Sequence, residues 1–218
     1  MEVLTGSMPR TLHDDRLRRQ AVAHLRKADP GMAGIIAEVG RCTFAPLAEG
    51  NHFDALVRAI VYQQLAGKAA AAIHAKFRAL YGGRDPLPAE VADTPDADLR
   101  SAGLSRQKLG YIKDLADHVD TGALPLDDLD ELADDDVLAS LVAVKGIGRW
   151  SAQMFLMFRL GRADVFPELD LGVQKAVQRL EGLADLPKPR EVARIGERWR
   201  PYRTIAAWYL WRSNGLNS

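Results

Sequence analysis

One glycine-containing turn at the start of a helix decides the fold of this chain: Val144-Lys145-Gly146-Ile147-Gly148-Arg149-Trp150-Ser151-Ala152. Apolar residues recur through and after the turn at three- and four-residue steps, which predicts a single apolar helical face from Ile147 to Phe158. Glycines beside a helix start allow close backbone approach, and the helix end offers unpaired amide donors with a partial positive charge. The turn therefore indicates a phosphate-binding site.

A single acidic residue, Asp170, follows this turn at the start of the next helix, within Phe166-Pro167-Glu168-Leu169-Asp170-Leu171-Gly172-Val173. Aspartate is a preferred helix N-cap, so a purely structural role would explain it. A helix N-terminus also favours the charged carboxylate, which makes a structural and a chemical role compatible. A phosphate-binding turn followed by a lone acid indicates chemistry on a nucleic acid.

Helical patterns dominate the rest of the chain, and no segment shows the alternation typical of strands. We therefore predict an all-α fold in which a helix, the tight turn at residues 145–148 and a second helix form a helix–hairpin–helix. The other predicted helices span about 14–28, 30–39, 52–81, 105–119, 170–180, 191–198 and 201–213.

The long helical segment that begins at His52 contains Gln63-Gln64-Leu65-Ala66-Gly67. Glycine inside a helical pattern lowers helix propensity, so we predict a break near Leu65 that gives two helices at a tight corner. Leu65 is exposed at such a corner, or is ordinary core; composition alone favours the core.

The composition is that of a globular protein: 218 residues, 47% of them hydrophobic and 27% charged. The single cysteine, Cys42, excludes an internal disulfide and any multi-cysteine metal or iron–sulfur site. We find no signal peptide and no apolar run near the roughly 18 residues of a membrane helix. A cytoplasmic protein that does not enter a membrane is expected.

The charges balance overall but are unevenly distributed. Lys+Arg and Asp+Glu both count 29, which argues against a protein that coats nucleic acid electrostatically. Residues 127–136 hold seven acids, whereas residues 188–212 hold seven bases and two acids. The basic segment could face phosphates; on charge alone, solvated helix faces are the favoured interpretation.

Several motifs, taken in order, resemble those of the helix–hairpin–helix DNA glycosylases, and most closely the 3-methyladenine DNA glycosylase II branch. The similarity covers about residues 20–213. The motifs are Gly146–Ala152, Asp164–Pro167, Asp170–Val173, Glu197–Arg203 and Trp211.

The resemblance implies two helical lobes flanking a DNA-binding cleft. One lobe would combine residues 13–51 and 167–218 and carry the acid; residues 52–166 would form the other, with the hairpin. Residues 1–12 are expected to be a flexible N-terminus, and the chain resembles a compact form without the N-terminal β-rich domain of larger members.

It also implies a monofunctional glycosylase that flips an alkylated purine out of double-stranded DNA and hydrolyses its N-glycosidic bond. Leu65 would fill the vacated space, although Ala66 stands where a serine is common. Lys145 replaces a usual proline and either contacts DNA or is solvated. The implied DNA-binding residues are Gln64, Leu65, Lys145, Gly146, Ile147, Gly148, Arg149 and Ser151.

Asp170 matches the family's catalytic acid. Trp150 occupies the position of the lysine nucleophile of bifunctional relatives, so no lyase activity is expected. Small residues at 171 and 172 suggest an open site, and Trp199 and Trp208 are assigned to the core. The implied base pocket comprises Trp150, Met154, Leu171, Tyr202 and Trp211.

No cofactor is expected to be required. By resemblance, the backbone carbonyls of Val142, Val144 and Ile147 could hold a structural Na⁺ or K⁺ beside the DNA phosphate. The expected partner is double-stranded DNA containing alkylated bases, bound by a monomer.

Two alternatives stay open. A non-catalytic helix–hairpin–helix module would bind DNA without releasing a base. A glycosylase for mismatched or oxidised bases would, in many relatives, need the hairpin lysine or an iron–sulfur cluster, and both are absent here.

Overall fold

The computed structural model describes residues 11–47 and 50–215, and its contacts divide the chain into two units. The first unit takes the chain up to Leu47 and again from Leu156, and the second takes the residues between them. The sequence-based boundaries at 51/52 and 166/167 differ from those of the two units, which fall at 47/48 and within α9 (Arg149–Phe158), between Phe155 and Leu156. Of the expected flexible segment 1–12, residues 1–10 lie outside the described residues.

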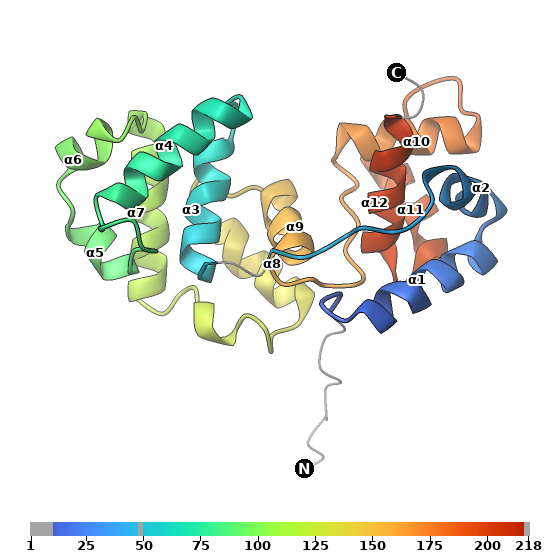
Figure 1. Ribbon diagram of the computed structural model, residues 1–218, viewed down its shortest axis with the longest axis horizontal. Helices are drawn as coiled ribbons and strands as arrows, with labels where there is room; N and C mark the ends of the chain where they lie inside the picture. The colour runs from blue at the N-terminus through green and yellow to red at the C-terminus, as the bar shows by residue number, and fades with distance from the viewer. Residues whose placement is uncertain (1–10, 48–49, 216–218) are drawn as a thin grey trace, which may run out of the picture. The chain divides into compact units, whose positions relative to one another are not determined.

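The first unit is built around α12, whose residues from Thr204 to Leu210 are all buried. A helix that is apolar on every side is stable only when other elements surround it. Figure 1 shows α12 packed among its neighbours, and α1, α2 and α10 contact it directly. The helices of this unit are α1 (Asp15–Ala28), α2 (Pro30–Val39), α10 (Leu171–Glu181), α11 (Pro189–Gly196) and α12 (Arg203–Asn214).

A buried acid joins the N-terminal and C-terminal segments within this unit. Asp29 caps α2 by accepting from the backbone N–H groups of Gly31 and Met32. Its other oxygen accepts from the indole Nε1 of Trp199 at 2.8 Å and from Nε of Arg198 at 2.8 Å. A buried carboxylate requires such partners, so this pairing stabilises the association of the two segments.

The second unit places α3 and α7 in contact, with α4 against α3 and both α5 and α6 against α7 (Figure 1). Most of the apolar stripe of α3 and α7 is buried, as their periodicity predicts. The helices of this unit are α3 (His52–Tyr62), α4 (Gly67–Ala79), α5 (Pro88–Asp93), α6 (Asp96–Ser101), α7 (Arg106–Asp120) and α8 (Asp134–Ala143).

The all-α prediction is confirmed for the described residues, where the only strand-like pairing is an isolated bridge between Thr11 and Arg162. The predicted corner is confirmed too, since α3 ends at Tyr62 and α4 begins at Gly67. Leu12, which was expected to fray, is fully buried, and its N–H donates to the carbonyl of Gly161. Within residues 11–47 and 50–215, no helix has the length and apolarity that crossing a membrane demands.

Candidate nucleic-acid interface and acidic site

The hairpin turn joins α8 to α9 and depends on Gly146. Its φ of +83° lies in the left-handed region, and a Cβ there would meet the Tyr111 ring at 2.2 Å. Only glycine meets both conditions without strain. Ile147 is buried and its N–H donates to the carbonyl of Val144, whereas Gly148 and Arg149 are exposed at the start of α9. The turn thus presents the N-terminus of α9 to solvent, where an anion can approach it.

Lys145 is tied to α7 instead of being free in solvent. Both its backbone N–H and its Nζ donate to the carboxylate of Asp114, at 2.8 and 2.7 Å. Burial raises the pKa of Asp114, but the hydrogen bonds from Lys145 lower it more, and the pKa lies below its ordinary value. The hydrogen bond to Asp114 raises the pKa of Lys145. A proline at this position could not supply the backbone donor.

The corner between α3 and α4 carries a strained residue. Gln64 has a φ of +56°, which for a non-glycine residue costs about 1 kcal/mol or more. Next to it, Leu65 leaves 39% of its surface exposed. Strained backbone beside an exposed apolar side chain is characteristic of a functional site.

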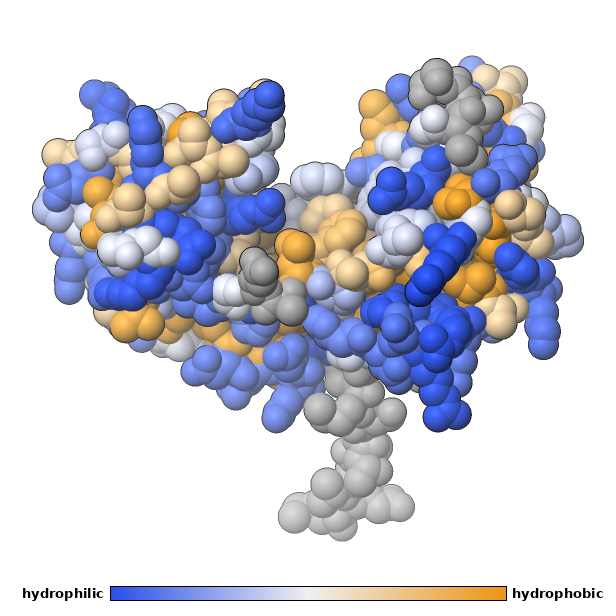
Figure 2. All heavy atoms as spheres, viewed as in Figure 1, coloured by the Kyte–Doolittle hydropathy of each residue, from blue (hydrophilic) through white to orange (hydrophobic). Residues whose placement is uncertain are grey.

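Trp150, in the first turn of α9, is 44% exposed. On the face seen in Figure 2, hydrophilic residues cover most of the helices and apolar residues emerge in small groups. An aromatic ring of this size that is open to solvent can offer a ligand a stacking surface. Ser151 and Met154 are half-buried on the same helix.

Asp170 is the N-cap of α10, as predicted. Its Oδ1 accepts from the backbone N–H of Val173 at 2.9 Å. The same oxygen accepts from the indole Nε1 of Trp211 at 2.8 Å. Both bonds fix the orientation of the carboxylate, and the helix terminus stabilises its negative charge.

The Trp211 indole is held from two further sides. It stacks on Phe158 with ring centroids 5.9 Å apart, and it passes close to Gly172. A Cβ at Gly172 would lie 3.0 Å from Asp170 Oδ1 and 3.1 Å from Trp211 Cδ1. The small residue at 172 therefore accommodates the indole and does not open the site there, contrary to the expectation from sequence.

The other predicted pocket residues of the first unit fall in different places. Leu171 is 53% exposed at the start of α10. Tyr202 is buried and its ring packs edge-on against His24 of α1, so the structure places it in the core and not on a surface open to a base. Trp199 and Trp208 are buried, as expected.

Three arginines of the basic segment 188–212 form ion pairs inside the first unit. Arg198 pairs with Asp29 and Glu181, while Arg200 and Arg203 both pair with Asp164. These three arginines pair with acids of the same unit, which differs from the solvated helix faces favoured on charge alone.

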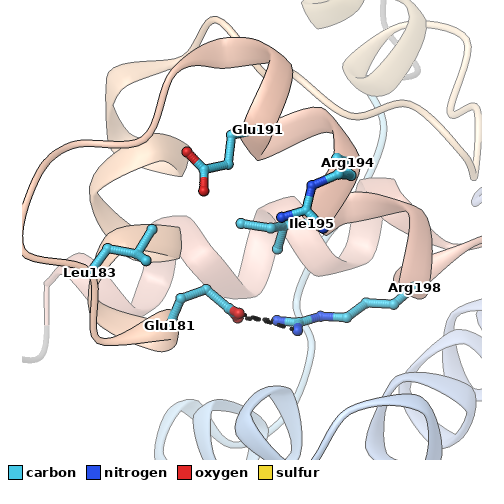
Figure 3. Close-up of a pocket in the computed structure, with 6 residues that line it drawn as sticks. All are labelled: Glu181, Leu183, Glu191, Arg194, Ile195 and Arg198. Carbon is cyan, nitrogen blue, oxygen red and sulfur yellow. Dashed lines mark hydrogen bonds and ion pairs between the residues drawn. The ribbon is translucent and has the colours of Figure 1, made fainter.

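The first unit also has a surface pocket, shown in Figure 3. Acids and bases both line it, and Arg198 is already paired with Glu181 across it. None of the residues that line the pocket is a site residue predicted from the sequence. The lining residues are Glu181, Leu183, Glu191, Arg194, Ile195 and Arg198. We therefore do not assign the function to it.

The sequence did not predict the contacts that fix the positions of the site residues. The Asp114 link to Lys145 could have been suspected, because a lysine in place of a proline restores a backbone donor. Trp211 was predicted as a pocket wall, and its bond to Asp170 was not foreseen because the two lie 41 residues apart. No local pattern announces the contact of Gln63 with Gly146 or that of Lys108 with Val61.

The family model described as "HhH-GPD superfamily base excision DNA repair protein" matches residues 57–201. The chain belongs to this superfamily. The family inferred from the sequence motifs is thereby confirmed, and the hairpin and Asp170 of this HhH-GPD protein both lie within the matched region.

Individual proteins and solved structures are also similar to this chain. DNA-3-methyladenine glycosylase 1 of Schizosaccharomyces pombe is 32% identical over 90% of this HhH-GPD chain and 88% of its own. The solved structure of S. pombe 3-methyladenine DNA glycosylase (Mag1) in complex with abasic DNA matches with a TM-score of 0.77, over 90% of this chain and 97% of that one. A Bacillus halodurans DNA-3-methyladenine glycosidase matches with a TM-score of 0.82 and 35% identity, over 89% of each chain.

Proposed function

We propose that this HhH-GPD protein is a monofunctional DNA glycosylase that excises alkylated purines, of the 3-methyladenine and 7-methylguanine type, from double-stranded DNA. The observation that carries the proposal is the Asp170 carboxylate, held at a helix N-terminus by Val173 and Trp211. The names of relatives that share most of the chain support the substrate class.

The chemistry follows from the charge of the damaged base. An alkylated purine is cationic, so it leaves as a neutral base with the electron pair of the bond to C1′ and needs no protonation. Positive charge then builds on the sugar. A preorganised carboxylate stabilises that charge, and water adds to C1′ with loss of a proton to leave an abasic site. In this account Asp170 is the catalytic residue.

The second unit would bind the DNA. Backbone N–H groups around Gly148 at the start of α9 suit a phosphate oxygen, with Ser151 as a hydroxyl donor. Flipping a nucleotide costs a few kcal/mol, least for a damaged base, and leaves a gap that Leu65 would fill. The exposed Trp150 ring offers a cationic base a stacking surface worth about 0.5–2 kcal/mol.

We propose that the enzyme has no lyase activity, because Trp150 cannot form the Schiff base that a lysine would form. Borohydride in the presence of abasic DNA should leave no covalent adduct with the protein. We also propose that it acts as a monomer, since the hairpin, the corner and the acid all come from one chain.

A monovalent cation would suit the hairpin. The last turn of a helix leaves carbonyls without intrahelical partners, and Val142 and Val144 lie on either side of Ala143, where α8 ends. The Val144 carbonyl accepts from the Ile147 N–H and retains a second lone pair. We propose that the carbonyls of Val142, Val144 and Ile147 would hold Na⁺ or K⁺, which would supply positive charge to the neighbouring phosphate.

The direct test is base release from duplex DNA methylated to contain 7-methylguanine and 3-methyladenine. We expect free methylated bases and a matching number of abasic sites. Binding without release would show the non-catalytic alternative instead, and release of oxidised or mismatched bases alone would reassign the substrate class.

A further inference from the structure

Lys108 lies where helix electrostatics disfavours it. It is the third residue of α7, close to the partial positive charge of the helix N-terminus. Its Nζ donates to the carbonyl oxygen of Val61 at 2.6 Å and to that of Gln63 at 2.8 Å. These carbonyls form the C-terminal end of α3, where a cation is stabilising. Burial lowers the pKa of Lys108, as expected for an ammonium group partly removed from water.

Gln63 extends the same connection to the hairpin. Its side-chain Nε2 donates to the carbonyl oxygen of Gly146 at 2.8 Å, a contact between residues 83 positions apart. The backbone carbonyl of Gln63 therefore accepts a hydrogen bond from Lys108, while its side chain donates one to the hairpin turn. The next two residues are the left-handed Gln64 and the exposed Leu65.

We propose that Lys108 and Gln63 form a corner latch, which holds Leu65 in its exposed position at a fixed distance from the hairpin. This inference rests on the proposed function for the role of Leu65 as the wedge. Lys108 and Gln63 are positioning residues: Lys108 anchors the end of α3, and Gln63 sets the register between the corner and the turn. A preorganised wedge enters the duplex without first having to be ordered.

The chain supplies a matched control for Lys108. Lys113, on the same helix, donates its Nζ to the carbonyl oxygens of Ala92 and Thr94, both at 2.6 Å. These carbonyls lie at the end of α5, so Lys113→Met removes an equivalent helix-end contact away from the corner. Lys108→Met and Gln63→Met each break one half of the latch, and Lys108→Arg keeps the charge.

The first measurement needs no DNA. The N–H groups of Gln63 and Leu65 donate to the carbonyls of Ile60 and Tyr62, so hydrogen exchange at these amides reports on the corner. We expect exchange about tenfold faster in Lys108→Met and in Gln63→Met, with no change at these amides in Lys113→Met and restoration in Lys108→Arg. Unchanged exchange in both latch variants would overturn the proposal.

The second measurement follows the wedge on DNA. 2-Aminopurine placed opposite a tetrahydrofuran abasic analogue brightens when a side chain enters the stack. We expect the increase to be at least about threefold smaller for Lys108→Met than for Lys113→Met, and base release to fall more on duplex than on single-stranded DNA. Equal signals would overturn the latch. A wild-type protein that releases no base would instead overturn the proposed function, since exchange and fluorescence do not depend on catalysis.

Discussion

Trp211 donates its indole Nε1–H to Oδ1 of Asp170 at 2.8 Å and so joins α12 to the start of α10. The indole is itself fixed by Phe158, on which it stacks. The orientation of the carboxylate therefore depends on packing inside the first unit as well as on its own helix. This relationship makes Trp211 a test of how closely the site depends on preorganisation.

Trp211→Phe should reduce base release about tenfold while leaving the fold intact. Phenylalanine retains stacking on Phe158 but lacks the donor, and a hydrogen bond to a charged group contributes about 1.5–3 kcal/mol. Single-turnover excision assays measure the effect. Trp208→Phe, on the same helix, is the control and should keep the wild-type rate; an equal loss in both variants would indicate a general packing defect.

Gly172→Ala distinguishes the effect of an added side chain on the site from its effect on helix stability. Alanine in a helix is worth up to about 1 kcal/mol over glycine, but the added Cβ would crowd Asp170 and Trp211 at 3.0 and 3.1 Å. We expect slower excision with stability little changed. Gly110→Ala in α7 meets nothing within 4 Å and should stabilise the protein with full activity. Full activity in Gly172→Ala would show that the close approach is dispensable.

The helices could be predicted from sequence because their signals are local. Gly67 marks the break between α3 and α4, and Asp170 caps α10 because aspartate favours that position. Contacts between distant residues have no local signal. The Tyr202 side chain carries the same aromatic pattern whether it faces a base or His24, and only the packing of α1 decides it.

The two hairpin glycines should respond differently to alanine. Gly146→Ala places a Cβ against Tyr111 in a left-handed conformation, so we expect a loss of at least about 2 kcal/mol in the free energy of unfolding. At Gly148 a Cβ meets nothing within 4 Å. Gly148→Ala should therefore unfold like the wild type but bind duplex DNA about tenfold more weakly, because the methyl group stands where the phosphate approaches. Thermal unfolding and DNA titration distinguish the two; wild-type affinity in Gly148→Ala would move the phosphate elsewhere.

The contribution of Asp114 to the stability of the folded protein should depend on pH. Its pKa is lowered below the ordinary 3.8 in the folded state, so its contribution is fully present above about pH 4 and is lost as the pH falls through the lowered pKa. Asp114→Asn should lower the free energy of unfolding only slightly at pH 7, since the Lys145 side chain is well exposed and water screens the ion pair. Urea unfolding should show that this difference shrinks by pH 3. A difference that is the same at both pH values would mean that the charge on Asp114 contributes nothing.

The lysines of α7 make contacts that their sequence pattern does not predict. Arg106, Lys108 and Lys113 form a basic group near a helix start, a pattern that suggests phosphate contacts. In the structure Lys108 and Lys113 instead close the ends of α3 and α5. The destination of a long flexible side chain depends on which carbonyls the fold brings within reach, and no local pattern specifies that.

In the proposed reaction, the Asp170 carboxylate stabilises the positive charge that develops on the sugar. Asp170→Asn retains the shape of the side chain and the oxygen that accepts from Val173 and Trp211, but it removes the charge. An opposite charge about 4 Å away contributes about 4 kcal/mol at an effective dielectric constant of 20, so we expect release of 7-methylguanine and 3-methyladenine from duplex DNA to fall about 10²- to 10³-fold. DNA binding and the unfolding temperature should stay close to wild type. Release within about threefold of the wild-type rate would contradict the assignment of Asp170 as the catalytic residue.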